Sequence, residues 1–341
     1  MANITDVARR AGVSPTTAKR AINNPELLAP ATLKRVKRAI AQLAYEPDQR
    51  AAALRSGHSK TIGLIVGNID EPFFASLIRV ISRTLRAQGY TLLVADNEYD
   101  TRNELEQLKT FQRNRIAGLI LRSGYGKPNL KYVQRMKAND TAVVEVDFLM
   151  PESPFSHVML DNTRCMKLGL EYLHSLGHKR IATLGSYHET ILPDERTKAF
   201  PELMADLGLA VSEAYERIIH PTSAEAYRIT HELMNLPEPP TALFATTGNL
   251  ASGAFQALRE RGLELPQDIS LLSFDNYPWT HMVAPAIDVI AQPVEDMSIA
   301  AAEMIVREIE TPDRPAEQVR FPGTLIKRGS CAAPQAMNVI V

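Results

Sequence analysis

The chain has 341 residues, of which 45% are hydrophobic and 23% charged, a normal balance for a globular protein of more than one domain. Its two cysteines, Cys165 and Cys331, are too few for a disulfide framework. No apolar run approaches the roughly 18 residues that a membrane span needs, and no secretory leader is recognisable, so we expect a cytoplasmic protein. We find no zinc-ligand spacing and no phosphate-binding loop, and we expect neither a metal nor a cofactor.

Charge is distributed very unevenly along the chain. Residues 1–60 contain 11 lysines and arginines and 4 acids, a formal charge of +7, whereas residues 61–341 contain 27 and 35, a formal charge of −8. A cationic head on an acidic body is typical of a phosphate-binding module joined to a second module. The alternative is a solvated charged face with no nucleic-acid partner.

The start of the chain has the pattern of a helix-turn-helix. Val7 and Ala11 lie at helical spacing, Gly12 breaks the period, and a second helix begins at Pro15. We expect Ser14 to cap that helix, because its side chain can accept a hydrogen bond from a free amide of the first turn. The polar side chains that should face outward and fit a DNA major groove are Thr16, Thr17, Lys19 and Arg20.

Two further helical segments follow. A third helix is expected at about residues 30–43, with apolar and basic stripes on opposite sides. Residues 49–55 lie between Asp48, a good helix cap, and Gly57, a good terminator. Isolated helices below about 12 residues are marginal in water, so we expect this segment to fold only against a partner.

These motifs resemble the head of the lactose/galactose repressor family of bacterial transcription regulators. The matching residues are Asp6-Val7-Ala8, Ala11-Gly12-Val13-Ser14, Thr17, Arg20, Asn23, Tyr45, Pro47, Ala51 and Leu54. The resemblance implies a DNA interface of Thr5, Ser14, Pro15, Thr16, Thr17, Lys19, Arg20, Asn23, Tyr45, Ala51, Leu54 and Arg55. It also implies that the hinge helices of two subunits pair and insert Leu54 into the minor groove as an apolar wedge. A buried leucine in a linker is the alternative.

From residue 61 the pattern changes to buried strands that alternate with amphipathic helices. Strands are expected at residues 62–66, 91–94, 118–121, 142–146, 180–184, 242–245 and 269–274. Helices are expected near residues 72–88, 101–115, 129–138, 163–176, 196–207, 223–235 and 249–261. This alternation predicts an α/β core of two lobes with doubly wound parallel sheets and a ligand cleft at the carboxyl ends of the strands.

This part of the chain also resembles the sensor domain of the same family, which is similar to periplasmic sugar-binding proteins. The matching pieces include Glu71-Pro72-Phe73-Phe74, Asp161-Asn162, Ser273-Phe274-Asp275 and Leu325-Ile326-Lys327-Arg328. The expected domains are a helix-turn-helix domain at 1–46, a hinge helix and linker at 47–60, an effector-binding and dimerisation domain at 61–328, and a tail at 329–341. Within the effector domain, the N-terminal lobe should take about 61–160 and 292–325, and the C-terminal lobe about 161–291.

Seven residues are expected to line the effector site, some carried over by resemblance and others placed there by their position after a strand. They are Phe73, Arg122, Asp147, Arg196, Thr247, Asp275 and Gln292. Asp275 and Arg196 are expected to bind ligand oxygens, with an interlobe salt bridge as the alternative. Phe73 is expected to form an apolar wall, with core packing as the alternative.

Two departures from the family pattern concern the charge of the cleft. Thr247-Gly248 stands where sugar sensors of the family commonly have Asn-Asp, and Arg122 stands where they often have a neutral polar residue. We therefore expect a more positive cleft and an anionic effector, a sugar acid or a sugar phosphate. Pairing of Arg122 with a structural acid is the alternative.

Together these features predict a sequence-specific transcriptional regulator, a repressor, that acts as a homodimer on double-stranded operator DNA. A small carbohydrate-type effector should control the order of the hinge helices through its different affinity for two arrangements of the lobes. A solute-binding protein and an α/β enzyme are the other classes. For the enzyme, Ser186, His188 and Asp194 are candidates, but the glycine pattern of a nucleophile elbow is missing.

The wedge leads to a first prediction. Leu54→Ala should weaken operator binding by a few kcal/mol, because the protein loses the insertion that unstacks and bends the duplex. Effector affinity should not change. Fluorescence anisotropy with operator DNA and calorimetry with effector measure the two quantities, and an unchanged operator affinity would argue against the wedge.

Overall fold

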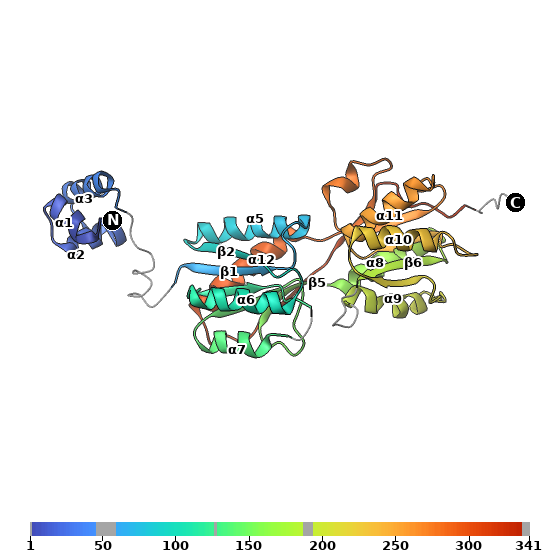
Figure 1. The fold of residues 1–341 in the computed structure, drawn as a ribbon, viewed down its shortest axis with the longest axis horizontal. Helices are drawn as coiled ribbons and strands as arrows, with labels where there is room; N and C mark the ends of the chain where they lie inside the picture. The colour runs from blue at the N-terminus through green and yellow to red at the C-terminus, as the bar shows by residue number, and fades with distance from the viewer. Residues whose placement is uncertain (1, 46–58, 126–127, 187–193, 336–341) are drawn as a thin grey trace. The chain divides into compact units, whose positions relative to one another are not determined.

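Figure 1 shows the computed structural model of the chain, which describes residues 2–45, 59–125, 128–186 and 194–335. By its internal contacts the chain divides into two compact units, Met1–Ser59 and Lys60–Val341. Within the described ranges, no helix is both long enough and apolar enough to cross a membrane.

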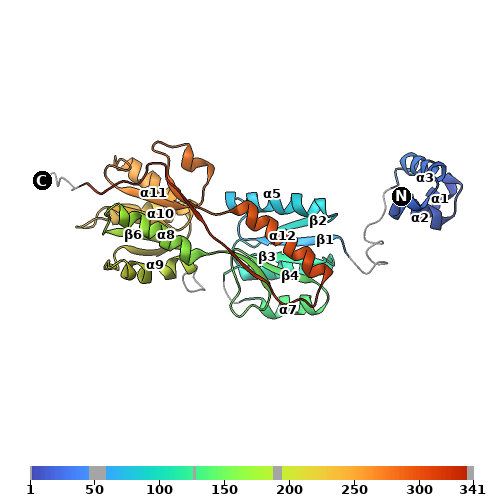
Figure 2. The ribbon, with the colours of Figure 1, turned by 180° about the vertical axis from the view of Figure 1, so that it is seen from behind.

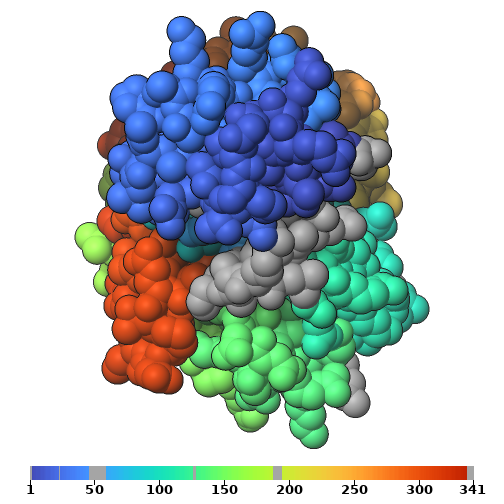
Figure 3. Space-filling view, turned by 90° about the vertical axis from the view of Figure 1, so that its left-hand side faces the viewer, coloured from blue at the N-terminus to red at the C-terminus, as the bar shows by residue number. Residues whose placement is uncertain are grey.

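The first unit is a small helical domain. α1 (Ile4–Ala11) and α2 (Pro15–Asn23) are joined through Gly12, whose φ of 63° is left-handed and favours glycine. η1 (Pro25–Leu27) and α3 (Pro30–Leu43) complete it. Its core residues are small, which lets the helices approach closely. They are Val7, Ala8, Ala11, Ala18, Ala21, Val36 and Ala39. Figure 3 shows the atoms of this domain, in blue, packed against one another at the surface.

The first lobe of the second unit is built on a six-stranded sheet with the order β11-β5-β4-β3-β1-β2. Its strands are β1 (Thr61–Val66), β2 (Thr91–Asp96), β3 (Gly118–Leu121), β4 (Ala142–Val146), β5 (Ser156–Leu160) and β11 (Gln318–Phe321). All neighbours pair in parallel. Its helices are α5 (Pro72–Ala87), α6 (Thr101–Arg113), α7 (Leu130–Ala138) and α12 (Val294–Glu310).

Helices cover both faces of this sheet, so its central strands β1, β3, β4 and β5 are buried on both sides. Successive residues of β1 point in opposite directions. Leu64 packs in the cluster formed with α5 and α12, and Ile65 packs in the cluster formed with α6 and α7. Figure 2 shows α12 running across the sheet on the side of α5.

The second lobe repeats this architecture on a sheet with the order β12-β10-β9-β8-β6-β7. Its strands are β6 (Ile181–Ser186), β7 (Glu216–Ile219), β8 (Ala242–Ala245), β9 (Ser270–Phe274), β10 (Asp288–Ala291) and β12 (Thr324–Ile326). α8 (Asn162–Ser175) and α9 (Glu195–Asp206) pack on one face, and α10 (Ser223–Leu233) and α11 (Gly248–Glu260) on the other. A short helix, η2 (Pro278–His281), precedes β10. Only β12 pairs antiparallel, so the predicted doubly wound parallel fold is confirmed.

The chain crosses between the lobes three times. It crosses between β5 and α8, between β10 and α12, and between β11 and β12. These crossovers bring segments far apart in sequence side by side between the lobes (Figure 2). The lobes are therefore joined by three covalent links rather than one.

The last crossover corrects the expected lobe boundaries. Residues 324 and 325 lie in β12 and pair with β10 in the second lobe, not in the N-terminal lobe as expected. Nor does a free tail begin at 329, because the Ser330 hydroxyl accepts a hydrogen bond from Asp288 N–H at 2.7 Å and donates one to the Leu271 carbonyl at 2.6 Å. The second lobe therefore extends at least to Ala332, whose carbonyl oxygen lies 2.9 Å from His178 Nε2.

Candidate functional site

The second helix of the small domain begins at a well-defined cap. Ser14 Oγ accepts a hydrogen bond from the Thr17 N–H at 3.1 Å, as the sequence predicts. Pro15 takes the first helical position, where no N–H is needed. This cap fixes where the exposed side chains of α2 begin.

The exposed face of this domain is polar and cationic. Lys19 and Arg20 are exposed on α2, whereas Ala18 and Ala21 of the same helix are buried in the core. Further exposed residues are Thr5, Ser14, Pro15 and Thr16 on or before these helices, and Lys34, Arg35, Lys37 and Arg38 on α3. A rigid helix with this surface fits a DNA major groove.

The remaining residues of the expected DNA interface lie in different surroundings. Thr17 is half-buried, with its hydroxyl oxygen 2.9 Å from Ser14 Oγ. Tyr45 is half-buried and packs against the helical core. Asn23 is the last residue of α2. Ala51, Leu54 and Arg55, with nearly all of the expected hinge, lie outside the described residues.

In the second unit, a cavity between the lobes takes side chains from both. The first lobe contributes Glu71, Phe73, Phe74, Tyr99, Arg122, Tyr125, Asp147, Phe148, Leu149 and Met159. The second contributes Asn162, Ser186, Asp194, Glu195, Arg196, Pro221, Thr247, Asn249, Asp275 and Tyr277, and Gln292 lies on the crossover before α12. The structure thus brings together along one cavity all seven residues that the sequence analysis expected at the effector site.

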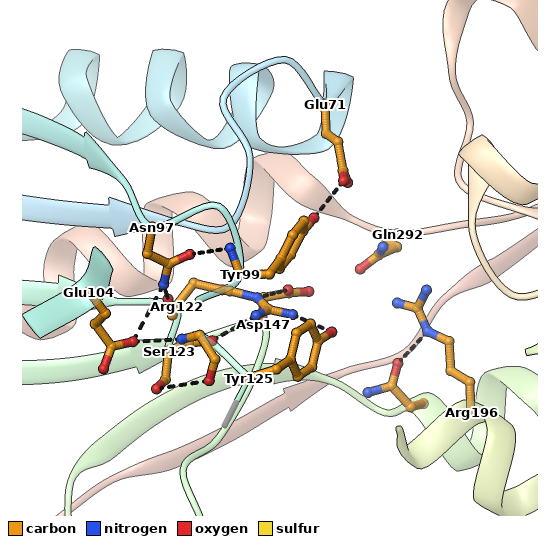
Figure 4. Close-up of polar contacts among 12 residues, drawn as sticks. Glu71, Asn97, Tyr99, Glu104, Arg122, Ser123, Tyr125, Asp147, Arg196 and Gln292 are labelled. Carbon is orange, nitrogen blue, oxygen red and sulfur yellow. Dashed lines mark hydrogen bonds and ion pairs between the residues drawn. The ribbon is translucent and has the colours of Figure 1, made fainter. Parts of the chain in front are cut away.

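Arg122, at the end of β3, is fully engaged by its own lobe. It is 3% exposed, and its Nε lies 3.3 Å from Asp147 Oδ2. Its Nη1 donates to the Ser123 carbonyl at 2.6 Å, and its Nη2 donates to the Tyr125 hydroxyl at 2.6 Å. Figure 4 shows these contacts.

Aromatic rings surround the Arg122 guanidinium. Its central carbon lies 4.6 Å from the ring centroid of Tyr99, 4.4 Å from that of Tyr125 and 5.0 Å from that of Phe148. Burial alone lowers the pKa of Arg122, but Tyr125 and Asp147 outweigh it and raise the pKa above its usual value. Burial raises the pKa of the Asp147 carboxyl, and the two arginines Arg122 and Arg196 only partly offset this.

The positive charge that Arg122 was expected to offer an effector is used within the protein. Asp147 pairs with Arg122, which is the alternative that the sequence left open. The described residues that line the cavity include five carboxyl groups, those of Glu71, Asp147, Asp194, Glu195 and Asp275, and two guanidinium groups, those of Arg122 and Arg196. A sugar acid or a sugar phosphate would meet an excess of like charge here, so the structure does not favour an anionic effector.

Arg196 is held in a different way, by neutral acceptors. Its Nε donates to Asn162 Oδ1 at 2.8 Å and its Nη1 donates to the Thr246 carbonyl at 2.8 Å. The guanidinium also lies over the Phe274 ring, 4.2 Å from the centroid. Among the described residues, these hydrogen bonds of Arg196 are to neutral oxygens and not to a carboxylate.

Asp275 and Gln292 meet at the ends of neighbouring strands. Gln292 Nε2 donates to Asp275 Oδ1 at 2.7 Å, and the Gly248 N–H donates to Asp275 Oδ2 at 3.1 Å. The second amide atom of Gln292, Oε1, is buried and accepts no hydrogen bond in the described part of the chain. It is an acceptor without a donor, on the wall of a cavity.

The two other predicted effector residues have structural roles as well. Thr247 caps α11, since its hydroxyl accepts a hydrogen bond from the Leu250 N–H at 3.2 Å. Phe73 is 6% exposed and belongs both to the cavity wall and to the main apolar cluster.

The chain is similar to known proteins over nearly its whole length. A model of the lacI family of bacterial regulatory proteins matches residues 3–48, and a model of the periplasmic binding protein-like domain matches residues 170–331. Over 335 residues, 97% of each chain, the protein is 30% identical to the HTH-type transcriptional repressor PurR of Pectobacterium carotovorum subsp. carotovorum. The chain belongs to the lacI family.

Other members of the lacI family are similar over comparable lengths. The HTH-type transcriptional regulator GalR of Escherichia coli is 27% identical over 334 residues, which are 98% of this chain and 97% of that one. A LacI family regulator from Enterococcus faecium, solved with bound ribose, is 25% identical, with a TM-score of 0.70 over 81% of this chain and 100% of that one. The Lac repressor dimer bound to operator, at 21% identity, has a TM-score of 0.86 over 97% and 99% of the two chains, and shows the same fold.

This lacI-family protein is a DNA-binding transcriptional regulator and not an enzyme, as the sequence predicts. Two of the catalytic candidates instead serve the structure. Ser186 Oγ lies 3.3 Å from Thr246 Oγ1, and Asp194 caps α9 by accepting a hydrogen bond from the Thr197 N–H at 2.8 Å. The third candidate, His188, lies outside the described residues.

Several cavity residues of this lacI-family protein were not predicted as site residues, among them Glu71, Tyr99, Tyr125 and Asn162. The first three lie in the loops after β1, β2 and β3, and Asn162 follows β5. Because the carboxyl ends of parallel strands share one edge, this position after a strand was the available signal. Glu71 and Tyr99 are joined by a hydrogen bond of 2.5 Å, and burial raises the pKa of both groups.

A buried carboxyl group supports the backbone near Arg122. Glu104 is fully buried and accepts hydrogen bonds from the Gly124 N–H at 2.6 Å and from Asn129 Nδ2 at 2.8 Å. Asn97 Nδ2 donates to the Arg122 carbonyl at 2.9 Å (Figure 4). These contacts hold the loop after β3 from behind the cavity.

A second buried carboxyl group holds the loop after β4. Glu145 accepts hydrogen bonds from the Met150 N–H at 3.0 Å and from the Ser153 hydroxyl. This loop carries Asp147 and Phe148 into the cavity. Burial raises the pKa of Glu145 to about 7.

Glu145 should make stability depend on pH. Its pKa is higher in the native state than its ordinary value of 4.5, so the native state binds more protons between these values. Its stabilising contribution should be present below about pH 4.5 and be lost as pH rises through about 7, a change of about 3 kcal/mol at most. Glu145→Gln cannot titrate and should lack this component.

Urea unfolding followed by Trp279 fluorescence measures this effect in the second unit, because Trp279 is the chain's only tryptophan. Measurements between about pH 5 and about pH 8 should show the wild type losing stability relative to Glu145→Gln. Glu106→Gln, a change at an exposed helix residue, is the control. Parallel curves for wild type and Glu145→Gln would contradict the assignment.

Proposed function

We propose that this regulator is a cytoplasmic homodimer whose affinity for operator DNA is set by a small, carbohydrate-type effector in the interlobe cavity. The observation that carries the proposal is one cavity lined by side chains of both lobes, in a chain that also carries an exposed cationic helix. A ligand that contacts both lobes at once has a different affinity for each arrangement of the lobes, and this difference can shift the DNA-binding equilibrium.

The DNA side of the proposal rests on α2. The cap at Ser14 fixes the start of this helix, on which Thr16, Lys19 and Arg20 are exposed. Such polar and basic side chains can bind the base edges and phosphates of a major groove. One helix reads only a few base pairs, so two copies on a pseudo-palindrome would supply operator affinity. The shared fold with a Lac repressor dimer bound to operator supports this arrangement.

The effector side of the proposal rests on the chemistry of the cavity wall. Arg196, Asp275 and Gln292 offer charged and amide groups that can bind hydroxyl groups. Aromatic rings, among them those of Phe73 and Tyr277, supply flat apolar surface. Related regulators have been solved with cellobiose and with ribose, and this supports a carbohydrate-type molecule here.

Control of operator binding would follow from the three crossovers. A ligand that contacts both lobes favours one arrangement of the lobes. The three crossover segments, including the residues beside Gln292, must then accommodate the change in arrangement. The first lobe leads directly back to residues 47–60, the expected hinge. A ligand that favours the DNA-binding arrangement acts as a corepressor, and one that favours the other arrangement acts as an inducer.

Lys19→Ala tests the DNA contact. Operator affinity should fall at low salt, and the slope of log affinity against log salt should become shallower by about 1, because one phosphate contact is lost. Anisotropy titrations with duplex fragments that flank the gene measure both quantities. Lys198→Ala, which changes an exposed lysine of α9, is the matched control. An unchanged slope for Lys19→Ala would contradict the contact.

Arg196→Ala tests the effector contact. A carbohydrate that raises the melting temperature of the wild type should bind the variant at least about tenfold more weakly, because a charged hydrogen bond is lost. The variant without ligand should keep wild-type affinity for DNA. Thermal shift and calorimetry measure the first result and anisotropy the second, and unchanged carbohydrate affinity would contradict a role for Arg196.

A further inference from the structure

The carboxyl groups that line the cavity differ in whether they already have a positive partner. Asp147 is paired with Arg122 across 3.3 Å. Glu195 forms a bidentate ion pair with Arg320 of β11. Arg320 Nη2 lies 3.1 Å from Glu195 Oε1, and Nη1 lies 3.2 Å from Oε2. These two carboxylates are neutralised by the protein itself.

Among the residues that the structure describes, three other carboxyl groups in the wall accept hydrogen bonds from neutral donors and from no cation. Glu71 accepts a hydrogen bond from the Tyr99 hydroxyl. Asp275 accepts from the Gly248 N–H and from Gln292 Nε2, and Asp194 accepts from the Thr197 N–H. One guanidinium, that of Arg196, is not committed to an acid by the contacts of the described residues. The wall therefore carries more uncompensated negative than positive charge.

Two of these carboxyl groups come from opposite lobes and act on each other through space. Glu71 lies before α5 in the first lobe, and Asp275 follows β9 in the second. Repulsion from Asp275 adds to burial in raising the pKa of Glu71. Figure 4 shows the Glu71 carboxyl, the Gln292 amide and Arg196 turned toward a common space.

Gln292 is hydrogen-bonded to one of these two groups, Asp275, and lines the same cavity as Glu71. Its Nε2 is used by Asp275, so its buried Oε1 is fixed as an acceptor and has no donor. A bound ligand also excludes water from Glu71 and Asp275, and burying like charges without a counter-charge is costly. Around Asp275 and Gln292, the described cavity wall thus presents negative charge and a free acceptor, without a positive charge to match the first or a hydrogen-bond donor to match the second.

We propose that the effector carries a protonated amine, as an amino sugar does, and that this amine binds among Glu71, Asp275 and Gln292 Oε1. An ammonium group has three N–H donors and no acceptor, which matches these three acceptors. It also supplies the missing counter-charge between the lobes. This inference deepens the proposed function and rests on it, because it names the chemical class of the molecule in the same cavity.

Matched sugars test the charge directly. Full-length protein is heated at about pH 7 with D-glucose, D-glucosamine, N-acetyl-D-glucosamine or D-glucuronate, and with the corresponding galactose and mannose series. In at least one series, the amine should raise the melting temperature more than the neutral parent, the neutral N-acetyl form and the acid. If no series shows this order, including the case in which no sugar raises the melting temperature, the proposal is overturned.

Isosteric variants locate the amine. Glu71→Gln and Asp275→Asn should each reduce the preference for the amine over its neutral parent, measured as a ratio of Kd values, by about tenfold. Glu106→Gln, at an exposed residue paired with Lys109, should leave the ratio unchanged. A preference that survives both cavity variants would overturn the assigned position.

DNA binding by the same preparation separates this inference from the proposed function. If the protein binds gene-flanking DNA with a steep salt dependence and a neutral sugar or an acid outranks its amine, only the amine is wrong. If the protein binds no DNA at any salt concentration, the proposed function fails as well.

Discussion

Arg122 and Asp147 lie at the ends of neighbouring strands, and their ion pair determines both the shape and the charge of the cavity. The β3–β4 register sets Leu121 opposite Glu145, so the residues that follow these strands emerge side by side. Neither group could be buried without the other, because an unpaired charge at such a site costs several kcal/mol. The pair, enclosed by Tyr99, Tyr125 and Phe148, forms one wall of the cavity, and Arg196 is a second guanidinium that lines it.

The two lobes use their arginines in contrasting ways. Each guanidinium lies against an aromatic ring, Arg122 against tyrosines of the first lobe and Arg196 against Phe274 of the second. The first is bound to an acid and supported from behind by Glu104 and its partners. The second is held by neutral oxygens, which orient it without cancelling its charge. In the first lobe the arginine is therefore part of an ion-paired wall, whereas in the second lobe the described contacts of Arg196 leave its positive charge uncompensated.

The sequence was informative where local rules and strand ends decide the structure. The cap at Ser14 and the helix at 30–43 follow from local capping and periodicity, and the structure contains both. The seven strands expected in the core are all present, because each is a short, mainly apolar run. The sequence did not predict β5, β7, β10, β11, β12 or α12 as elements. β7 and β11 contain charged residues and lie at sheet edges, so they lack the continuous apolar run of a central strand.

The electrostatic character of the site could not be deduced in the same way. Sequence analysis placed Arg122 and Asp147 on one cleft but could not decide that they bind each other, since this depends on strand order and register. It treated Arg122 as a positive charge that a ligand could bind, whereas in the structure Arg122 forms an ion pair with Asp147. The pairing of Glu195 with Arg320 depends on a chain crossover, and periodicity carries no signal for such a contact.

The return of the chain to the first lobe affects how the protein is made. α12 covers the sheet face that includes Leu64, and β11 pairs with β5 at the sheet edge, yet both come from residues 294–321. On the ribosome, residues 61–160 emerge long before this cover exists. Until then an apolar face and an open strand edge are exposed to other nascent chains, a situation that favours misassembly. We infer that the first lobe reaches its native packing only after residues 294–321, and with them most of the second lobe, have been synthesised.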